Sequence, residues 1–496
     1  MCLLAAPAAF AQLGAPAGQS SAAPAAIQLP LSGRTGQTGS VAVTQVPIPG
    51  ATTSVNTLNT SIQVQGPYQG SVQSKPFTGT ALSLREAIQR GLDFNLAAVG
   101  VSSAVRQAGG QRRVARSGLL PSVNSALRET VQQTNLRALG VRIPFAPSVV
   151  GPFNYFDLRA TLTQSVADLT VLNNYRSARE LQEAAVRSAE DARDLVVLAV
   201  GGAYLQVIAA NARVQSARAQ VDTAKATYDQ TAQRKQVGVV AQIDVNRSQV
   251  DLQTRQQRLI TLENDLSKQK INLARLVGLP PNDRLQISDE IPFSPAPDVT
   301  LDDALKQAFA SRSDLKAGEA QIRAAERAKA AARAERLPSL AFTADYGAIG
   351  TNPSQAHGTF TVAGSLRLPI WQGGRVEGEI QEADAALDQR KAELEDARGR
   401  VESEVRNAFL DLQAAANQVE VARNNQQVAR DTLRLTRERF EAGITDIVEV
   451  VQSQESVAAS DLDYITSVFA HNVAKLTLAR AMGRAEESYA RFLGIP

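Results

Sequence analysis

Apolar residues recur with a helical period through a long stretch without proline, from Thr170 to Gly278. In the lower part of its first helix, predicted over residues 171–236, the apolar positions alternate between steps of four and three, which is the seam of a coiled coil. The seam residues are Ala210, Val214, Ala217, Val221, Ala224 and Tyr228. At about 1.5 Å per residue, the helix predicted over residues 171–236 is about 100 Å long. Such a helix must lie along neighbouring helices for its whole length, because its apolar seam needs cover.

This pattern occurs twice in the chain, at a constant offset. Gly238 returns as Gly443 and Ala203 as Ala408, and both 443 − 238 and 408 − 203 equal 205. The other matched segments are Ala203-Tyr204-Leu205 with Ala408-Phe409-Leu410, and Leu273-Ala274-Arg275 with Leu478-Ala479-Arg480. An ungapped repeat of this length indicates two copies of one structural unit, which pack together to bury surface that neither buries alone.

Between the helical segments of each copy the apolar period changes from 3.6 to 2, which predicts strands with one apolar face. The change follows a Leu-Pro-Ser sequence in both copies, at Leu120 and at Leu337. The predicted strands cover residues 121–133, 154–166, 338–350 and 359–371. Apolar residues expected on one face are Leu158, Leu162, Phe342, Val362 and Leu366, and charged residues expected on the other are Asp157, Arg159 and Arg367.

Four strands of this length raise the question of a membrane. About ten residues are enough for a tilted strand to cross a bilayer. Single-chain membrane barrels, however, begin at about eight strands, and lipid cannot satisfy the open edge of a sheet. If the strands enter a membrane, they must therefore close with strands of other subunits. A small soluble sheet that caps a helical bundle is the alternative.

The stretch from Leu195 to Ala210 is nearly all apolar, but it is shorter than the ~20 residues of a membrane-spanning helix. Its counterpart at the same offset, residues 400–415, carries the charged residues Arg400, Glu402, Glu404, Arg406 and Asp411. Because the two segments belong to equivalent helices, we interpret neither as a transmembrane helix.

Composition and charge fit packed helices and exclude some partners. Of the 496 residues, 44% are hydrophobic but only 5% are aromatic, which suits Ala-rich helix packing better than a bulky core. Lys plus Arg number 52 and Asp plus Glu 49. Because this balance is close to even, we expect no nucleic acid partner.

The N-terminal region carries a targeting signal and an arm. Residues 1–11 resemble the end of a secretory signal peptide, with Ala9-Phe10-Ala11 as the cleavage site. The only cysteine, Cys2, is lost with this segment, and a mature chain without cysteine fits an exported protein. Residues 12–80 contain mostly small and polar residues and almost no charge, which predicts a disordered arm.

The sequence does not indicate an enzyme. The two histidines, His357 and His471, stand far apart, and His471 is expected to be exposed to solvent. The sequence shows no Cys or His cluster, no phosphate-binding loop and no Ser-His-Asp spacing. We therefore expect no catalytic residues, no cofactor and no metal site. Gly373-Gly374 is expected to be a hinge between strand and helix, and Trp371 a membrane-interface residue.

The order of elements, their duplication and two turn segments resemble the TolC-like outer-membrane efflux channels, or outer membrane factors. The turns read Val237-Gly238-Val239-Val240-Ala241-Gln242-Ile243-Asp244-Val245 and Ala442-Gly443-Ile444-Thr445-Asp446-Ile447-Val448-Glu449-Val450. The resemblance covers about residues 82–483 and rests on the whole pattern. It implies a mainly α protein with membrane β structure. In such a protein the internally duplicated long-helix unit forms a homotrimer, whose 12-stranded outer-membrane β-barrel continues as a periplasmic α-helical barrel.

The resemblance also implies a function. Such channels are passive exit ducts that dock on a periplasmic adaptor and an inner-membrane pump, in tripartite efflux or type I secretion. The expected location is the outer membrane of a Gram-negative-type bacterium, in contact with its lipid and extending into the periplasm. The alternative is a soluble periplasmic adaptor or a coiled-coil scaffold. The sequence does not identify the substrate, because selectivity lies mainly in the pump.

The repeats divide the chain into segments. The first repeat covers residues 81–278 and the second residues 301–483. Each contains a helix, two strands, a long helix, a tip turn and a shorter helix. An equatorial linker is expected at 279–300, and residues 484–496 are expected to form a C-terminal tail.

Gly238 and Gly443 stand where the long helices reverse, which requires a residue that accepts a positive φ. The apolar residues beside them are explained equally well by a helix cap with a hydrophobic contact. The resemblance implies that these tips bind the adaptor. The docking residues expected on that basis are Arg234, Val237, Gly238, Val239, Arg439, Ala442, Gly443 and Ile444.

Acidic residues follow both tips, and helix dipoles alone favour acids in a first turn by ~0.3–1 kcal/mol each. The resemblance implies instead that Glu449 lines a constriction on a threefold axis and that Asp244 latches the tip to a basic residue. That basic position is Thr445 here, so the sequence departs from the family's latch. The expected gate residues are Asp244, Phe440, Asp446, Glu449 and Gln452. Gln452 replaces the family's second constriction acid, and Phe440 holds the family's aromatic position.

Overall fold

The structure is a computed structural model that describes residues 39–47, 58–72, 81–138, 140, 147–281, 284–290 and 293–494. Its contacts separate Met1–Thr38 from a second unit, Gly39–Pro496, and every element below belongs to the second unit. The expected signal segment, residues 1–11, lies outside the described residues.

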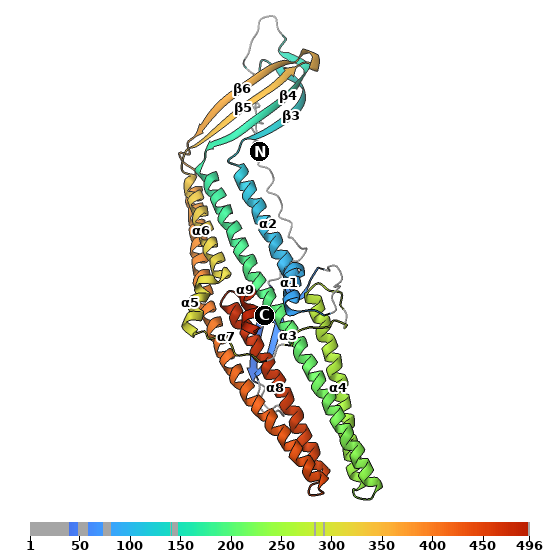
Figure 1. The fold of residues 1–496 in the computed structure, drawn as a ribbon. Coiled ribbons are helices and arrows are strands. Elements are labelled where there is room, and N and C mark those ends of the chain that lie inside the picture. The colour runs from blue at the N-terminus through green and yellow to red at the C-terminus, as the bar shows by residue number, and fades with distance from the viewer. Residues whose placement is uncertain are drawn as a thin grey trace, which may run out of the picture. The chain divides into compact units, whose positions relative to one another are not determined.

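Four helices form the two long hairpins that the repeat predicts (Figure 1). α3, Leu169–Gln236, reverses into α4, Gln242–Leu276, and α7, Arg375–Glu441, reverses into α8, Ile447–Ala481. The predicted seam of α3 faces its neighbours. Ala210, Val214, Ala217 and Ala224 are buried, and Val221 and Tyr228 are half-buried.

Two shorter helices precede the strands in each repeat, where the sequence pattern predicts one. They are α1, Leu84–Phe94, with α2, Leu96–Ser117, and α5, Leu301–Ser311, with α6, Ser313–Ala334. The prediction of an unbroken opening helix is therefore wrong in both repeats.

The breaks occur at Asn95 and Arg312, which are both buried and have non-helical backbone angles. The Asn95 side chain accepts a hydrogen bond from the Ala97 amide at 3.0 Å and donates one to the Tyr68 carbonyl at 2.9 Å. The Arg312 guanidinium pairs with the carboxylates of Asp314 at 2.7 Å and Glu404 at 2.5 Å. Tyr68 and Glu404 lie on other segments of the fold, so the local hydrophobic period did not indicate the breaks.

Four antiparallel strands form one sheet in the order β3-β4-β5-β6. The strands are β3, Ser122–Asn135, β4, Val149–Ala167, β5, Ser339–Gly350, and β6, His357–Arg367, with a 3₁₀ turn at Pro353–Gln355 before β6. The predicted strand 359–371 runs too far, because β6 ends before Pro369, which has no amide hydrogen for a ladder. Gly373 and Gly374 follow with positive φ, and Gly374 caps the start of α7, as expected of a hinge.

The strand register places the predicted apolar residues on one face of the sheet. Directly opposed residues share a face, and Leu158 opposes Leu127, Leu162 opposes Ala344, and Ala344 opposes Val362. Phe342 and Leu366 fall on the same face by alternation. On the opposite face Arg159 contacts Asp157 and Asp345 and donates to Thr359 Oγ1 at 3.0 Å. Arg367 shares that polar face by alternation along β6.

A small two-stranded sheet lies within the segment predicted to be a disordered arm. β1, Val41–Pro47, pairs antiparallel with β2, Leu58–Val64, and a 3₁₀ turn follows at Gly66–Gln69. The prediction of disorder over 12–80 is wrong for these residues. Val41, Val43, Ile62 and Val64 pack against the main core, and this alternation of β-branched residues is short enough to be missed among small polar residues.

The expected C-terminal tail also contains structure. Within 484–496, residues Ala485–Leu493 form α9, whose Phe492 and Leu493 are buried. The expected linker, 279–300, contains no helix among its described residues, and it contacts the core through Leu279 and Leu285 and forms one bridge between Ile287 and Leu82.

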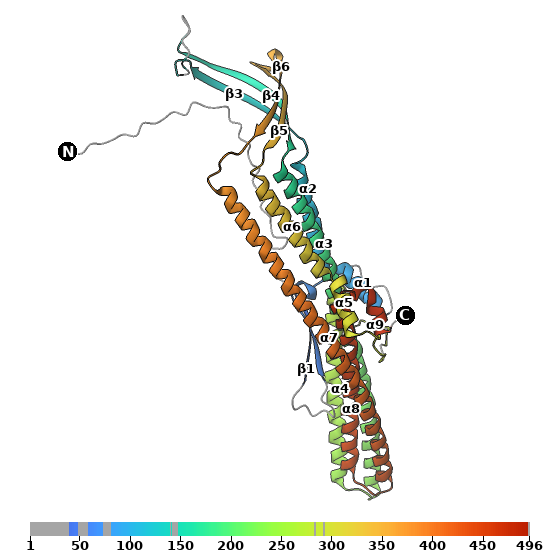
Figure 2. The same cartoon turned by 90° about the vertical axis from the view of Figure 1, so that its left-hand side faces the viewer.

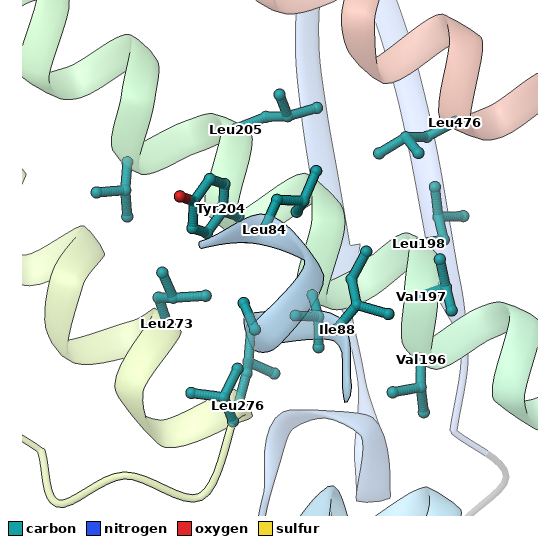
Figure 3. Packing of buried hydrophobic residues seen from close by; sticks show 14 of the residues in the cluster. Leu84, Ile88, Val196, Val197, Leu198, Tyr204, Leu205, Leu273, Leu276 and Leu476 are labelled. Atoms are coloured by element: carbon teal, nitrogen blue, oxygen red, sulfur yellow. The ribbon is translucent and has the colours of Figure 1, made fainter. Parts of the chain in front are cut away.

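The main core lies where α1, α3, α4 and α8 meet (Figure 3). Val196, Val197 and Val200 are fully buried there, and Tyr204 donates a hydrogen bond to the Leu82 carbonyl at 2.8 Å. Among the described helices, α3 contains an 18-residue stretch apolar enough to cross a membrane, but 67% of it is buried inside the protein. The apolar segment 195–210 is thus core, in agreement with our interpretation.

His471 is fully buried, so the expectation that it is exposed is wrong. Its ring packs against Phe293, with ring centroids 4.9 Å apart. Lys475, also fully buried, donates to the carbonyl of Ser294 at 2.5 Å and to its hydroxyl at 2.9 Å. Burial lowers the pKa of His471 to about 4, with a further contribution from the charge of Lys475, and burial lowers the pKa of Lys475 to about 8.

Candidate docking and gating site at the hairpin tips

Both long helices end in the same cap, which explains the paired glycines. Gly238 has φ +78° and Gly443 φ +72°, in the left-handed region that glycine tolerates best. At the first tip the Val239 amide donates to the Arg234 carbonyl and the Gly238 amide to the Lys235 carbonyl, both at 2.9 Å. The second tip repeats the pattern, and this pair of bonds is the Schellman motif.

The caps leave apolar side chains in solvent on both sides of each glycine. Val237 is 74% exposed, Val239 68% and Ile444 68%, and Ala442 is also exposed. A residue that merely supports a cap would be expected to pack against its helix. These exposed side chains therefore form an apolar surface that a partner protein can contact.

Arg234, one of the expected docking residues, makes contacts within the chain. Its guanidinium donates to the carbonyls of Phe440 at 3.0 Å and Glu441 at 3.3 Å, and it lies over the Phe440 ring at 4.7 Å from the centroid. These carbonyls belong to the last turn of α7. Arg234 thus caps the end of the other long helix and joins the two hairpins at their tips.

Phe440 is buried, although it is one of the expected gate residues. It packs with Ile447 and Val450 in a small core inside the second hairpin. Its exposed fraction is only 6%, so its ring cannot itself line an opening in this conformation. It acts on the tip by holding α7 to α8 and by supporting Arg234.

The acids of the second tip have identifiable partners. Asp446 is the N-cap of α8, and its carboxylate accepts hydrogen bonds from the amides of Val448 at 3.0 Å and Glu449 at 3.2 Å. Glu449 lies in the first turn and faces Arg439, with 3.9 Å between charged atoms. Both side chains of this pair are more than half exposed, so the pair contributes little to stability.

The acid of the first tip stands alone in its turn. Asp244 lies in the first turn of α4 and pairs with Arg247 at 3.7 Å. The N-cap of α4 is Ala241, which offers no side-chain cap, whereas the equivalent residue of the second repeat is Asp446. Thr445 is half-buried and Gln452 is exposed. The second tip therefore carries two acids at its helix start and the first tip only one.

Polar contacts that join the two hairpins below the core were not predicted from the sequence. Arg255 is buried and pairs with Asp251 in its own helix and with Glu455 of α8 at 2.7 Å. Gln454 donates to Thr227 Oγ1 of α3 at 2.9 Å. The partners are about 200 residues apart in the chain, and a single sequence contains no signal that would pair them.

Within the described part of the chain, no group of three or more His, Cys, Asp and Glu side chains could hold a metal ion. The tips instead present exposed apolar side chains, carboxylates at helix N-termini and a cap that joins two helices. Such a set can bind a protein surface and attract cations.

The comparison with protein families decides what these hairpins belong to. Residues 84–279 and 304–484 match the family described as outer membrane efflux protein. The chain belongs to this family. It is an outer-membrane efflux channel that extends into the periplasm, and its family is not a class of enzymes.

Known relatives are similar in sequence to this chain over most of their length. This efflux protein is 25% identical to the pyoverdine export outer membrane protein OpmQ of Pseudomonas putida over 82% of this chain and 87% of the relative. It is 24% identical to the outer membrane protein OprJ of Pseudomonas aeruginosa, over 85% and 88%. It is 24% identical to the outer membrane protein TolC of Escherichia coli, over 66% and 69%.

Solved structures show the same fold. The CmeC outer membrane channel of Campylobacter jejuni matches with a TM-score of 0.72 at 16% identity, over 90% of this chain and 96% of that chain. The outer membrane protein VceC of Vibrio cholerae matches with a TM-score of 0.70 at 18% identity, over 81% and 96%. The family match and these folds favour the efflux channel over the periplasmic adaptor or scaffold.

Proposed function

We propose that three copies of this chain close into one channel, with 12 strands in the outer membrane and a helical tunnel below them. The observation that carries this proposal is the four-stranded sheet with one apolar face. Its outer strands, β3 and β6, each have a single neighbour among the described strands. Lipid cannot form hydrogen bonds with the backbone N–H and C=O groups of these free edges. For this reason β6 of one copy must pair with β3 of the next.

Like the sheet, the layer of helices has two unlike edges that can pair between copies of the chain. α3 contacts α2 and α6 near the sheet and α4 and α8 toward the tips, while α7 contacts α6 and α8. α7 thus forms one edge of the helical layer, and α2 with α4 forms the other. A head-to-tail contact between these two unlike edges generates a closed ring, as the strands require.

The outer surface of the sheet is suited to lipid. Leu158, Val362 and Leu366 are 44%, 61% and 61% exposed on the apolar face in the single chain. At the base of the sheet Ile370 and Trp371 are 96% and 87% exposed. An exposed tryptophan beside an apolar band is typical of the membrane interface. Asp157, Arg159 and Arg367 would then line the water-filled lumen.

The tips supply the docking and gating surfaces of the channel. Exposed Val237, Val239, Ala442 and Ile444 would bind a periplasmic adaptor, which joins the channel to an inner-membrane pump. Asp446 and Glu449 would gather around the threefold axis of the closed tip. The acids of three copies would attract cations there, because like charges brought together raise the local negative potential.

The test is expression of the full chain followed by fractionation and gel electrophoresis without heating. A closed channel should remain with the outer membrane and migrate as a trimer that heat converts to a monomer. Release of the protein with the periplasmic contents as a monomer would contradict the proposal.

A further inference from the structure

The equivalent segments of α3 and α7 are buried to very different extents. In residues 196–205 of α3, nine of the ten residues are buried. In the counterpart, residues 401–410 of α7, only Val401, Val405 and Ala408 are buried, and they lie on one face. The helix α7 is covered on one side, whereas α3 must be covered on two. A second element therefore covers α3, and the described residues contain no equivalent element over α7.

The first cover of α3 is α1. A side-chain carbon added at Gly91 of α1 would lie 2.6 Å from Val200, so the two helices touch at this point. The second cover is the β1–β2 sheet, which contacts α3 and α8. A carbon added at Gly202 of α3 would lie 2.1 Å from Ile62 of β2.

The two covers lie on opposite faces of α3. Gly202 is two positions after Val200, which is a rotation of about 200° around the helix at 3.6 residues per turn. Figure 2 shows the same arrangement, with α1, α5 and α9 on one side of the long helices and β1 on the other. The position equivalent to Gly202 is Asn407, which is exposed, so within the described residues no such sheet covers the second repeat at this level.

If the helical layer closes into the proposed trimer, one of these faces becomes the lumen. Twelve helices spaced ~10 Å apart form a ring roughly 40 Å across, which leaves about 25–30 Å between side chains. Three copies of α1, α5, α9 and their linker would fill such a lumen and block it. They must therefore lie outside, and the face that carries β1 and β2 is the inner one.

We propose that the β1–β2 sheets of the three chains line the tunnel at the level of Gly202 and narrow it into a size filter. Each sheet adds a layer ~10 Å thick, so three of them reduce the opening to on the order of 10 Å. The cargo that passes is then a small solute and not a folded protein. This inference rests on the proposed trimer, and it narrows the substrate class of that channel.

The surface of the sheet that faces away from α3 is suited to water. Ala42 and Thr44 alternate with the packed Val41 and Val43 and are exposed. Thr44 and Ser61 share a hydrogen bond at 2.8 Å on that surface. These groups are small and uncharged, so the filter selects by size, in contrast to the acids of the tips.

Cysteine labelling of the purified trimer tests the location. In a Cys2→Ser background, Thr44→Cys stands on the inner sheet and Gln89→Cys on the outer side of α1, where Gln89 is exposed. A small methanethiosulfonate reagent should label both variants. A maleimide linked to a large polymer should label Gln89→Cys and fail to label Thr44→Cys. Labelling of both by the polymer would overturn the luminal placement.

A second pair of variants tests the filter itself. Gly202→Leu places a side chain where Ile62 lies and should displace β2, whereas Asn407→Leu makes the same change where no sheet lies. The largest polyethylene glycol that enters the open channel should increase in size for Gly202→Leu alone. An unchanged limit in an intact trimer contradicts the filter. Migration on an unheated gel reports the trimer separately, so loss of the trimer in the parent protein contradicts the channel itself.

Discussion

Arg234 and Arg439 occupy equivalent positions in the two repeats, yet their environments differ. Arg234 binds the last carbonyls of α7 and stacks on Phe440, whereas Arg439 has only a 3.9 Å pair with Glu449. Charge-assisted hydrogen bonds contribute about 1.5–3 kcal/mol each at most, and an exposed ion pair less than about 1 kcal/mol. The link between the hairpin tips therefore depends on one arginine of the two.

We predict that Arg234→Ala loosens the second tip and that Arg439→Ala does not. Hydrogen exchange at the amides of residues 440–444 should become roughly tenfold faster in the first variant, which corresponds to about 1.4 kcal/mol. Arg439→Ala serves as the control, because it removes the same charge from the equivalent position. Equal exchange in both variants would show that Arg234 does not hold the tip.

His471 predicts a pH dependence of stability. Its pKa is lowered to about 4 in the fold by burial and by Lys475, while in the unfolded chain it is about 6.5. As the pH falls from about 6.5 to 4, the unfolded state binds the proton and the native state does not. The contribution of His471 to native stability should therefore decrease over this interval by roughly 3 kcal/mol at most.

The matched variant is His471→Leu, since Leu266 stands at the equivalent position of the first repeat and packs against the core. Burial raises the pKa of Asp194 to about 6, and this carboxyl gains native stability as the pH falls over nearly the same range. The two effects offset each other in the parent protein. The variant should therefore lose less thermal stability than the parent between pH 7 and pH 4.5; identical losses would contradict the role of His471.

These residue roles mark the limit of what the sequence could predict. The helix caps at Gly238 and Gly443 were predictable, because a positive φ and a reversal are local properties. The capping by Arg234 and the burial of His471 depend on partners from other segments of the fold. Neither periodicity nor composition identifies such partners, so the capping by Arg234 was not predicted and the expectation that His471 is exposed was wrong.

At the scale of elements, the sheet shows why the alternation of apolar and polar residues predicted its two faces correctly. Its register puts Leu162 and Val362 on one face and Arg159 with Asp345 on the other, as the period of two requires. The β1–β2 sheet was missed because its strands are short and lie in a segment of small polar residues. The breaks at Asn95 and Arg312 were missed because buried polar contacts, and not glycine or proline, produce them.

The two faces of β4 should respond differently to the same substitution. Leu162→Arg puts a charge on the apolar face, at a cost of ~2–4 kcal/mol at the middle of a bilayer. Thr161→Arg puts it beside Asp345, which opposes position 161 in the sheet. The amount of unheated trimer in the outer membrane should fall strongly for the first variant only. Similar amounts would contradict the assignment of the faces.

The tips of the hairpins should be needed for efflux and not for assembly. Val239→Asp combined with Ile444→Asp makes both exposed apolar positions charged and should abolish dye export by cells while trimers remain in the outer membrane. Ala241→Asp is the control, because it introduces the same charge at the N-cap of α4, where Asp446 stands in the second repeat. Loss of the trimers in the double variant would favour a purely structural role for the tips.

At the scale of the whole molecule, duplication explains both the regularity and the exceptions. Two copies of one unit supply two hairpins and two pairs of strands, and closure of the ring requires copies of the chain to repeat that unit further. Two of the differences between the copies are the basis of our proposals. Gly202 with its covering sheet has Asn407 as its counterpart, and Ala241 has Asp446.

The last of these differences predicts the electrical behaviour of the closed channel. A threefold tip would gather three copies of Asp446 and Glu449, and converging carboxylates attract cations and repel one another. The trimer should therefore conduct cations preferentially and be blocked by multivalent cations in single-channel recordings.

The charge of these acids must be separated from their role as helix caps. Asparagine caps a helix about as well as aspartate, so Asp446→Asn with Glu449→Gln removes charge while the bonds to Val448 and Glu449 amides can persist. This double variant should lose cation selectivity and multivalent block, and its trimer should unfold at the temperature of the parent. Asp446→Ala, in contrast, should lose stability by about 1 kcal/mol. Unchanged selectivity and block in the double variant would show that the acids only begin the helix and that the constriction lies elsewhere.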